Sequence, residues 1–114
     1  MFESSVTAFQ GLMFALRHQR SVKAIAAIAI IVTAVSAFLK LTAVEYMILT
    51  TTISLVFITE LINSGLEYAI DLVTEDYHDL AKAAKDVAAA AVLLACVNAV
   101  LVGAIWLMGR LGWM

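Results

Sequence analysis

Five polar side chains share one face of a strongly apolar stretch, in the segment ELINSGLEYAID at residues 60–71. At about 100° per residue they fall within a helical stripe roughly 100° wide. Its members are Glu60, Asn63, Ser64, Glu67 and Asp71. Carboxylates two helical turns apart repel one another unless a positive group lies near, and the natural partners are a divalent cation or a lysine. We therefore expect this stripe to bind a charged group.

A second polar face follows on the next predicted helix, where Lys82, Lys85 and Asp86 lie together. The segment 60–86 thus offers carboxylates for a hard cation, a lysine for a phosphate and a carboxylate at the lipid–water boundary. For Glu67 and Asp71 the alternative is an ordinary charged helix end outside the membrane. Glu60 is harder to explain structurally, because an ionisable residue at membrane depth is rare and usually functional.

The elements that must position these side chains are long apolar helices. Hydrophobic residues make up 64% of the 114 residues and charged residues only 14%, against about half and about a quarter in soluble domains. Three apolar segments account for the excess, and crossing a bilayer takes roughly 20 helical residues. We predict one all-α membrane domain, residues 1–114, with three transmembrane helices at about 22–39, 41–73 and 80–109.

The residues before these spans predict a different kind of helix. VTAFQGLMFALRHQR, at residues 6–20, places apolar side chains at helical spacing and polar ones toward its end. This pattern is typical of an amphipathic helix that lies on the membrane surface, here at about residues 4–20. A disordered tail is the alternative.

The depth of Glu60 and the distribution of basic residues predict how the chain is oriented in the membrane. From Leu41 to Glu60 is about 29 Å of helix, close to the thickness of the hydrocarbon core, so Glu60 falls near one interface. Asp79 is predicted to cap the helix that follows. Basic residues favour a cytoplasmic N-terminus and an outer C-terminus, with Arg17, Arg20, Lys23, Lys82 and Lys85 inside and Lys40 and Arg110 outside. The net charge of −2 leaves no basic patch for nucleic acid.

The segment ELINSGLEYAID, followed by EDYHDLAKAAKDVAAAAVLLA at residues 75–95, resembles the small integral-membrane diacylglycerol kinases and undecaprenol kinases of bacteria. The family pattern is a Glu, Asn-Ser, a second Glu, an Asp, Tyr-His and Ala-Lys-Asp. Its matches here are Glu60, Asn63, Ser64, Glu67, Asp71, Tyr77, His78, Ala84, Lys85 and Asp86. No Gly-rich phosphate loop of the Walker type is present in the sequence.

The resemblance implies a homotrimer in the bacterial inner membrane, with active sites shared between subunits. The implied reaction moves the γ-phosphoryl group of ATP, with Mg²⁺ or another divalent cation, to the hydroxyl of a membrane lipid. That lipid is diacylglycerol, which gives phosphatidic acid, or undecaprenol. The shared motif serves phosphate chemistry, so it does not distinguish the two acceptors.

The resemblance also implies roles for individual residues. Glu60 would be the general base for the lipid hydroxyl, supported by Asn63, and Glu67 would be a metal ligand. Ser64 and Asp71 would be supporting residues. The nucleotide site would comprise Gln19, Glu67, Asp76, Tyr77, His78, Lys85 and Asp86.

One position departs from the family pattern. Gln19 stands where the family has a second metal-ligand Glu, and an amide oxygen supplies no charge. We therefore keep a low-activity kinase homologue as an alternative. The alternative from another class is a small proton- or cation-coupled transporter with Glu60 as its coupling carboxylate.

Overall fold

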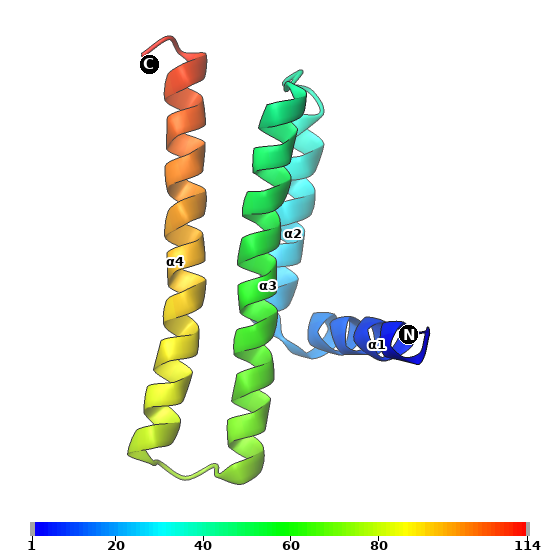
Figure 1. The fold of residues 1–114 in the computed structure, drawn as a ribbon, viewed down its shortest axis with the longest axis vertical. Helices are drawn as coiled ribbons and strands as arrows, with labels where there is room; N and C mark the ends of the chain where they lie inside the picture. Colours follow the sequence, from blue (N-terminus) through cyan, green and yellow to red (C-terminus); the bar gives the residue numbers. More distant parts are fainter. Residues whose placement is uncertain (1, 114) are drawn as a thin grey trace.

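The computed structural model describes residues 2–113, and in that part of the chain the regular elements are four α-helices. They are α1 (Phe2–His18), α2 (Arg20–Ser36), α3 (Ala43–Val73) and α4 (Asp79–Arg110). The last three run alongside one another, whereas α1 projects from the bundle (Figure 1). α3 packs against both α2 and α4 and also contacts α1. The predicted all-α class is confirmed.

A sharp bend separates the first two helices. Gln19 has φ −103° and ψ 116°, which is extended backbone, and the axes of α1 and α2 meet at 99°. The first helix therefore ends at His18, two residues before the predicted end, and begins at Phe2 rather than residue 4. If α2 crosses a bilayer, this bend lays α1 along the membrane surface.

Local hydrogen bonds fix where the two longest helices begin. Thr42 caps α3 with a capping box: its Oγ1 accepts from Glu45 N at 3.2 Å, and Glu45 Oε1 accepts from Thr42 N at 3.0 Å. The cap of α4 is His78, whose Nδ1 accepts from Leu80 N at 3.2 Å. The prediction that Asp79 is the cap is wrong. Asp79 is instead the first helical residue, where its negative charge favours the positive end of the helix dipole.

Length and composition distinguish the helices that could span a membrane from those that could not. Among the described helices, α3 with 31 residues and α4 with 32 are long and apolar enough to cross a membrane. Their bounds lie within two residues of the predicted 41–73 and 80–109. α2 has 17 residues and ends at Ser36, before a turn at 37–40, so it is shorter than the predicted 22–39. It contributes a third span only when α1 and α2 are taken as one bent pair.

Burial is inverted relative to a soluble protein. Among the described residues the buried apolar side chains are Ala15, Val22 and Ala95, and the buried polar ones are Ser36, Thr52, Glu60, Asn63 and Ser64. Large apolar side chains lie outside, as with Phe38 at 86% and Leu72 at 88% exposed. An apolar exterior around a polar interior suits a protein surrounded by lipid or by further subunits.

Glu45, Trp106 and Arg110 form a polar cluster, which we call the outer clamp, at the end of the bundle where α3 begins and α4 ends. Trp106 Nε1 donates to Glu45 Oε2, and Arg110 Nε lies 3.6 Å from the same oxygen. The Arg110 guanidinium also donates to Leu39 O at 3.0 Å and lies 5.5 Å from the Trp106 ring centroid. The outer clamp thus joins the turn between α2 and α3 to the end of α4.

Candidate active site

Glu60 is the most enclosed carboxylate of the predicted site. It lies on α3 with 7% of its surface exposed. Its Oε1 accepts a hydrogen bond from Ser21 Oγ at 2.6 Å and a longer one from Ser64 Oγ at 3.5 Å. Ser21 belongs to the first turn of α2, directly after the bend, whereas Ser64 lies one turn further along α3. Both hydroxyls therefore donate to the same carboxylate oxygen.

Asn63 and Glu67 form a pair on the same face of α3 as Glu60. Asn63 lies about one turn and Glu67 about two turns further along the helix. Asn63 Nδ2 donates to Glu67 Oε1 at 3.2 Å. The buried Asn63 Oδ1 has no hydrogen-bond partner among the residues that the structure describes. A buried oxygen without a partner is costly, so it points to a group that the protein chain itself does not supply.

These two side chains fit a divalent cation. A carboxylate and an amide oxygen are hard ligands, and Mg²⁺ typically takes only one or two protein carboxylates, with phosphate oxygens and water completing its octahedron. In residues 2–113 no three His, Cys, Asp or Glu side chains gather as a ready-made metal cluster. The donor set at Glu67, one carboxylate and one amide oxygen, would therefore fit Mg²⁺ only with other groups completing the coordination.

Gln19 contacts α3 next to this pair. Its Nε2 donates to the Tyr68 hydroxyl at 2.6 Å. The Tyr68 ring packs edge-on against Phe14 of α1, with ring centroids 5.6 Å apart, and Phe14 lies 4.4 Å from the His18 ring. The bend is thus fastened to α3 at the residue that follows Glu67. Among the described residues, the Gln19 side chain hydrogen-bonds to Tyr68 and not to Glu67 itself.

Two ion pairs occupy the polar ends of α3 and α4. Lys85 Nζ lies 2.7 Å from Asp71 Oδ1 across the two helices, and Lys82 Nζ lies 2.5 Å from Asp86 Oδ2 within α4. The side chains of Lys85 and Asp71 are 40% and 50% exposed. Exposed pairs of this kind exchange partners readily, because each contributes only about 0–1 kcal/mol to stability. A phosphate can therefore compete for either lysine.

The link between α3 and α4 holds the remaining predicted nucleotide residues. Asp76, Tyr77 and His78 are all exposed there. Asp76 N donates to Thr74 Oγ1 at 3.2 Å, and the His78 ring is engaged as the cap of α4. The link that carries these three residues joins the end of α3 to the start of α4 (Figure 1). The Lys85–Asp71 ion pair connects the same two helix ends.

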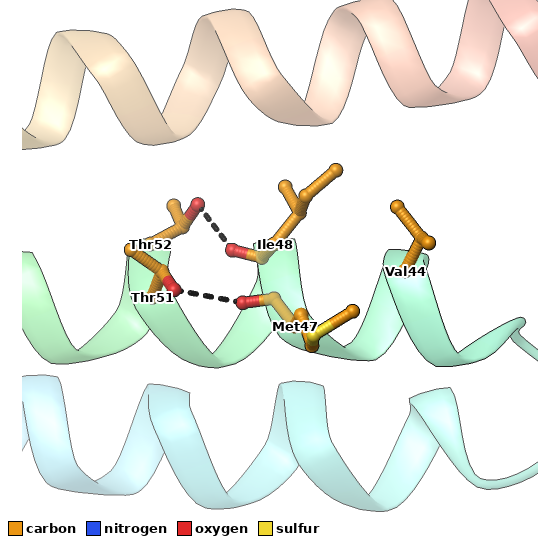
Figure 2. A pocket seen from close by; sticks show the side chains of 5 residues that line it. All are labelled: Val44, Met47, Ile48, Thr51 and Thr52. Atoms are coloured by element: carbon orange, nitrogen blue, oxygen red, sulfur yellow. Dashed lines mark hydrogen bonds between the residues drawn. The ribbon is translucent and has the colours of Figure 1, made fainter.

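A separate pocket opens on the other half of α3. It is lined by five residues that all belong to α3, namely Val44, Met47, Ile48, Thr51 and Thr52 (Figure 2). Both threonine hydroxyls donate to carbonyl oxygens one turn back, Thr51 to Met47 at 2.8 Å and Thr52 to Ile48 at 2.7 Å. The pocket consequently presents an apolar lining, and none of the predicted site residues contributes to it.

Sequence reasoning assigned no role to Ser21 or Tyr68, although both contact predicted site residues. Their nearness to predicted site residues in the sequence was the one indication of a role: Ser21 follows Gln19 by two residues, and Tyr68 follows Glu67 directly. Helical periodicity relates residues within one helix only. It therefore carries no information about which side chain of α2 meets which side chain of α3.

Comparison with known proteins gives a consistent result. The sequence profile of the family described as prokaryotic diacylglycerol kinase matches residues 6–107. A diacylglycerol kinase of Synechocystis sp. is 42% identical over 97 residues, which are 84% of this chain and 55% of that protein. The chain thus spans about half the length of that relative.

Two further relatives span different shares of the chain. An undecaprenol kinase of Bacillus subtilis is 37% identical over 102 residues, 90% of this chain and 83% of that protein. A diacylglycerol kinase of Escherichia coli is 35% identical over 78 residues, 68% of this chain and 64% of that protein. Because the family profile matches residues 6–107 and two relatives match 84% and 90% of the chain, the chain belongs to the prokaryotic diacylglycerol kinase family.

Proposed function

We propose that this chain is an ATP-dependent lipid kinase of a bacterial membrane, which transfers the γ-phosphoryl group of ATP to a lipid hydroxyl. Membership of the family supports the reaction class, and relatives are named for both diacylglycerol and undecaprenol. Either lipid is therefore an acceptor in this proposal. The transporter interpretation is not favoured, because the relatives are named as kinases.

The observation that carries the proposal is the placement of Glu60. The carboxylate is enclosed by two hydroxyl donors near the point where α1 joins the bundle. A lipid hydroxyl stays at the membrane interface, because its acyl or prenyl chains anchor it in the hydrocarbon. A base for such a substrate must lie at that level, and a carboxylate within reach accepts the proton as the bond to phosphorus forms.

In this proposal the remaining residues align the nucleotide. Glu67 and the partnerless oxygen of Asn63 would hold Mg²⁺, which when bound neutralises charge on the phosphate oxygens. Lys85 leaves Asp71 to bind a phosphate, Lys82 and Asp86 lie on the same helix end, and Asp76, Tyr77 and His78 line the nucleotide. Gln19 contributes a neutral oxygen where a carboxylate would attract the cation more strongly. Phosphoryl transfer depends mainly on such positioning and charge stabilisation.

We further propose three membrane-spanning helices per chain, with the N-terminus and the α3–α4 link cytoplasmic, and assembly as a homotrimer. The basic residues support the orientation, since Lys82 and Lys85 lie near the start of α4 and Arg110 lies at its end. The exposed apolar surface supports contact with lipid and with further copies of the chain. Crosslinking in native membranes followed by mass measurement tests the trimer.

The decisive experiment for the reaction is lipid-dependent ADP release by the purified chain in mixed micelles. We expect ADP release with Mg²⁺, ATP and either diacylglycerol or undecaprenol, and little without lipid. Glu60→Gln keeps the shape of the side chain but removes the base, so it should abolish lipid-dependent release. Glu3→Gln makes the same chemical change at an exposed residue of α1 and should leave it intact. Full activity of the Glu60 variant would refute the assigned mechanism.

A further inference from the structure

Ser21 makes the shortest described contact to the proposed base. The separation of Ser21 Oγ and Glu60 Oε1 is 2.6 Å, whereas the Ser64 hydroxyl lies 3.5 Å from the same oxygen. A hydroxyl-to-carboxylate bond of about 2.5–2.7 Å is of the strong, charge-assisted kind, and 3.5 Å is at the outer limit of a hydrogen bond. Ser21 is therefore the principal donor to Glu60.

The contact joins two helices. Ser21 comes from the first turn of α2, while Glu60 and Ser64 share α3. Ser21 itself is exposed, but Glu60 is 7% exposed. The Gln19–Tyr68 hydrogen bond, two residues before Ser21, fastens the same bend to α3. The bend thus holds the Ser21 hydroxyl at a fixed place over the enclosed carboxylate.

We infer that Ser21 is a positioning residue for Glu60, an inference that rests on the proposed kinase function. Its hydroxyl donates a hydrogen bond to Glu60 Oε1 and thereby fixes the rotamer of the carboxylate. Glu60 Oε2 remains as the oxygen that accepts the proton of the lipid hydroxyl. In the transfer step the lipid O–H bond breaks and its proton moves to Oε2. The lipid oxygen forms a bond to the γ-phosphorus, the bond from that phosphorus to the β–γ bridging oxygen breaks, and ADP leaves.

The test compares variants of Ser21 in the full chain, by lipid-dependent ADP release in mixed micelles with ATP and Mg²⁺. Ser21→Ala removes the donor, and Ser21→Cys replaces it with a weak donor of similar size. We expect both to lower kcat by about 10- to 100-fold, the effect of one hydrogen bond to a charged group. KM for ATP and for the lipid should stay within about twofold, because Ser21 acts on the base rather than on binding.

Two further variants complete the design. Ser21→Thr keeps the hydroxyl and should recover most of the lost kcat. Thr33→Val removes a hydroxyl from the same helix, and that hydroxyl donates only to Ala29 O of its own helix at 2.7 Å. This control should behave like the parent chain. Circular dichroism and size-exclusion elution establish that each variant is folded and assembled.

The outcomes separate this inference from the proposed function. A kcat equal to that of the parent chain in Ser21→Cys or Ser21→Ala, with Glu60→Gln inactive, overturns the role of Ser21 and leaves the kinase mechanism standing. An active Glu60→Gln variant overturns the mechanism itself. A raised KM with unchanged kcat shows that the hydroxyl acts on binding rather than on the base, and it overturns the inference. An equal loss of kcat in Ser21→Thr and Ser21→Ala shows that the loss does not depend on the hydroxyl, and it also overturns the inference. Recovery in Ser21→Thr alone supports it.

Discussion

Replacing Gln19 by Glu should strengthen metal binding without disturbing the fold. In the structure Gln19 Nε2 donates to the Tyr68 hydroxyl at 2.6 Å. A carboxylate at this position accepts from the same hydroxyl instead, so the contact between the bend and α3 survives with its donor reversed. The substitution therefore adds one negative charge next to Tyr68, the residue that follows Glu67, at the position where the resemblance leads us to expect a metal-ligand carboxylate, and changes little else.

The size of the effect follows from simple electrostatics. Two unit charges about 4 Å apart attract by about 4 kcal/mol at the effective dielectric constant near a protein surface. Dehydration of the carboxylate and of the cation offsets most of that attraction. A net gain of about 1–2 kcal/mol corresponds to a factor of roughly 5–30 in an equilibrium constant. We expect the Mg²⁺ concentration for half-maximal turnover to fall by that factor.

The assay is lipid-dependent ADP release as a function of Mg²⁺ at saturating ATP and lipid. Gln10→Glu is the matched control, since it makes the same substitution at an exposed residue of α1 and should leave the Mg²⁺ dependence unchanged. Thermal unfolding of the Gln19 variant should coincide with that of the parent chain. An unchanged Mg²⁺ dependence and unchanged turnover in a folded Gln19→Glu variant would show that this position does not approach the metal.

Three further predictions concern the nucleotide, the outer clamp and the cation. Lys85→Met should lower kcat/KM for ATP by about 10- to 100-fold, because it removes one charge-assisted hydrogen bond to phosphate. Asp71→Asn should retain most activity. Steady-state kinetics measures both effects. Trp106→Phe removes the donor to Glu45 and should lower the melting temperature by about 3–6 °C, with kcat unchanged. Excess EDTA should stop lipid phosphorylation and added Mg²⁺ restore it, while circular dichroism shows the helices intact.

The sequence predicted the helices well because their signals are local. The long apolar runs located α3 and α4 to within two residues of their bounds. The helical period put Glu60, Asn63 and Ser64 on one face of α3, and the structure shows that these three residues are buried. Both inferences use only residue type and a period of 3.6 residues. The uncharged residues beyond Ser36 look equally helical, so the early end of α2 was not predictable from composition.

The rest of the site depends on contacts between helices. Ser21 meets Glu60 across 39 positions and Gln19 meets Tyr68 across 49. Those contacts require the 99° bend, which arises from the extended backbone of a single residue. The choice of His78 over Asp79 as the cap depends on backbone geometry in the same way. Neither follows from residue spacing along one helix.

If the chain is the proposed kinase, the perpendicular arrangement of α1 and α2 should make its turnover sensitive to bilayer thickness. In the proposed arrangement α1 would lie among the lipid headgroups. The 17 residues of α2 span only about 26 Å at the usual helical rise, less than a typical hydrocarbon layer of about 30 Å. Longer acyl chains must compress locally or draw the bundle into a different tilt. Either response would shift the height of Glu60 relative to the lipid hydroxyl that it deprotonates in the proposed mechanism. The proposed kinase should therefore work fastest in thin membranes, and hydrophobic mismatch would govern its rate without any change in the substrate.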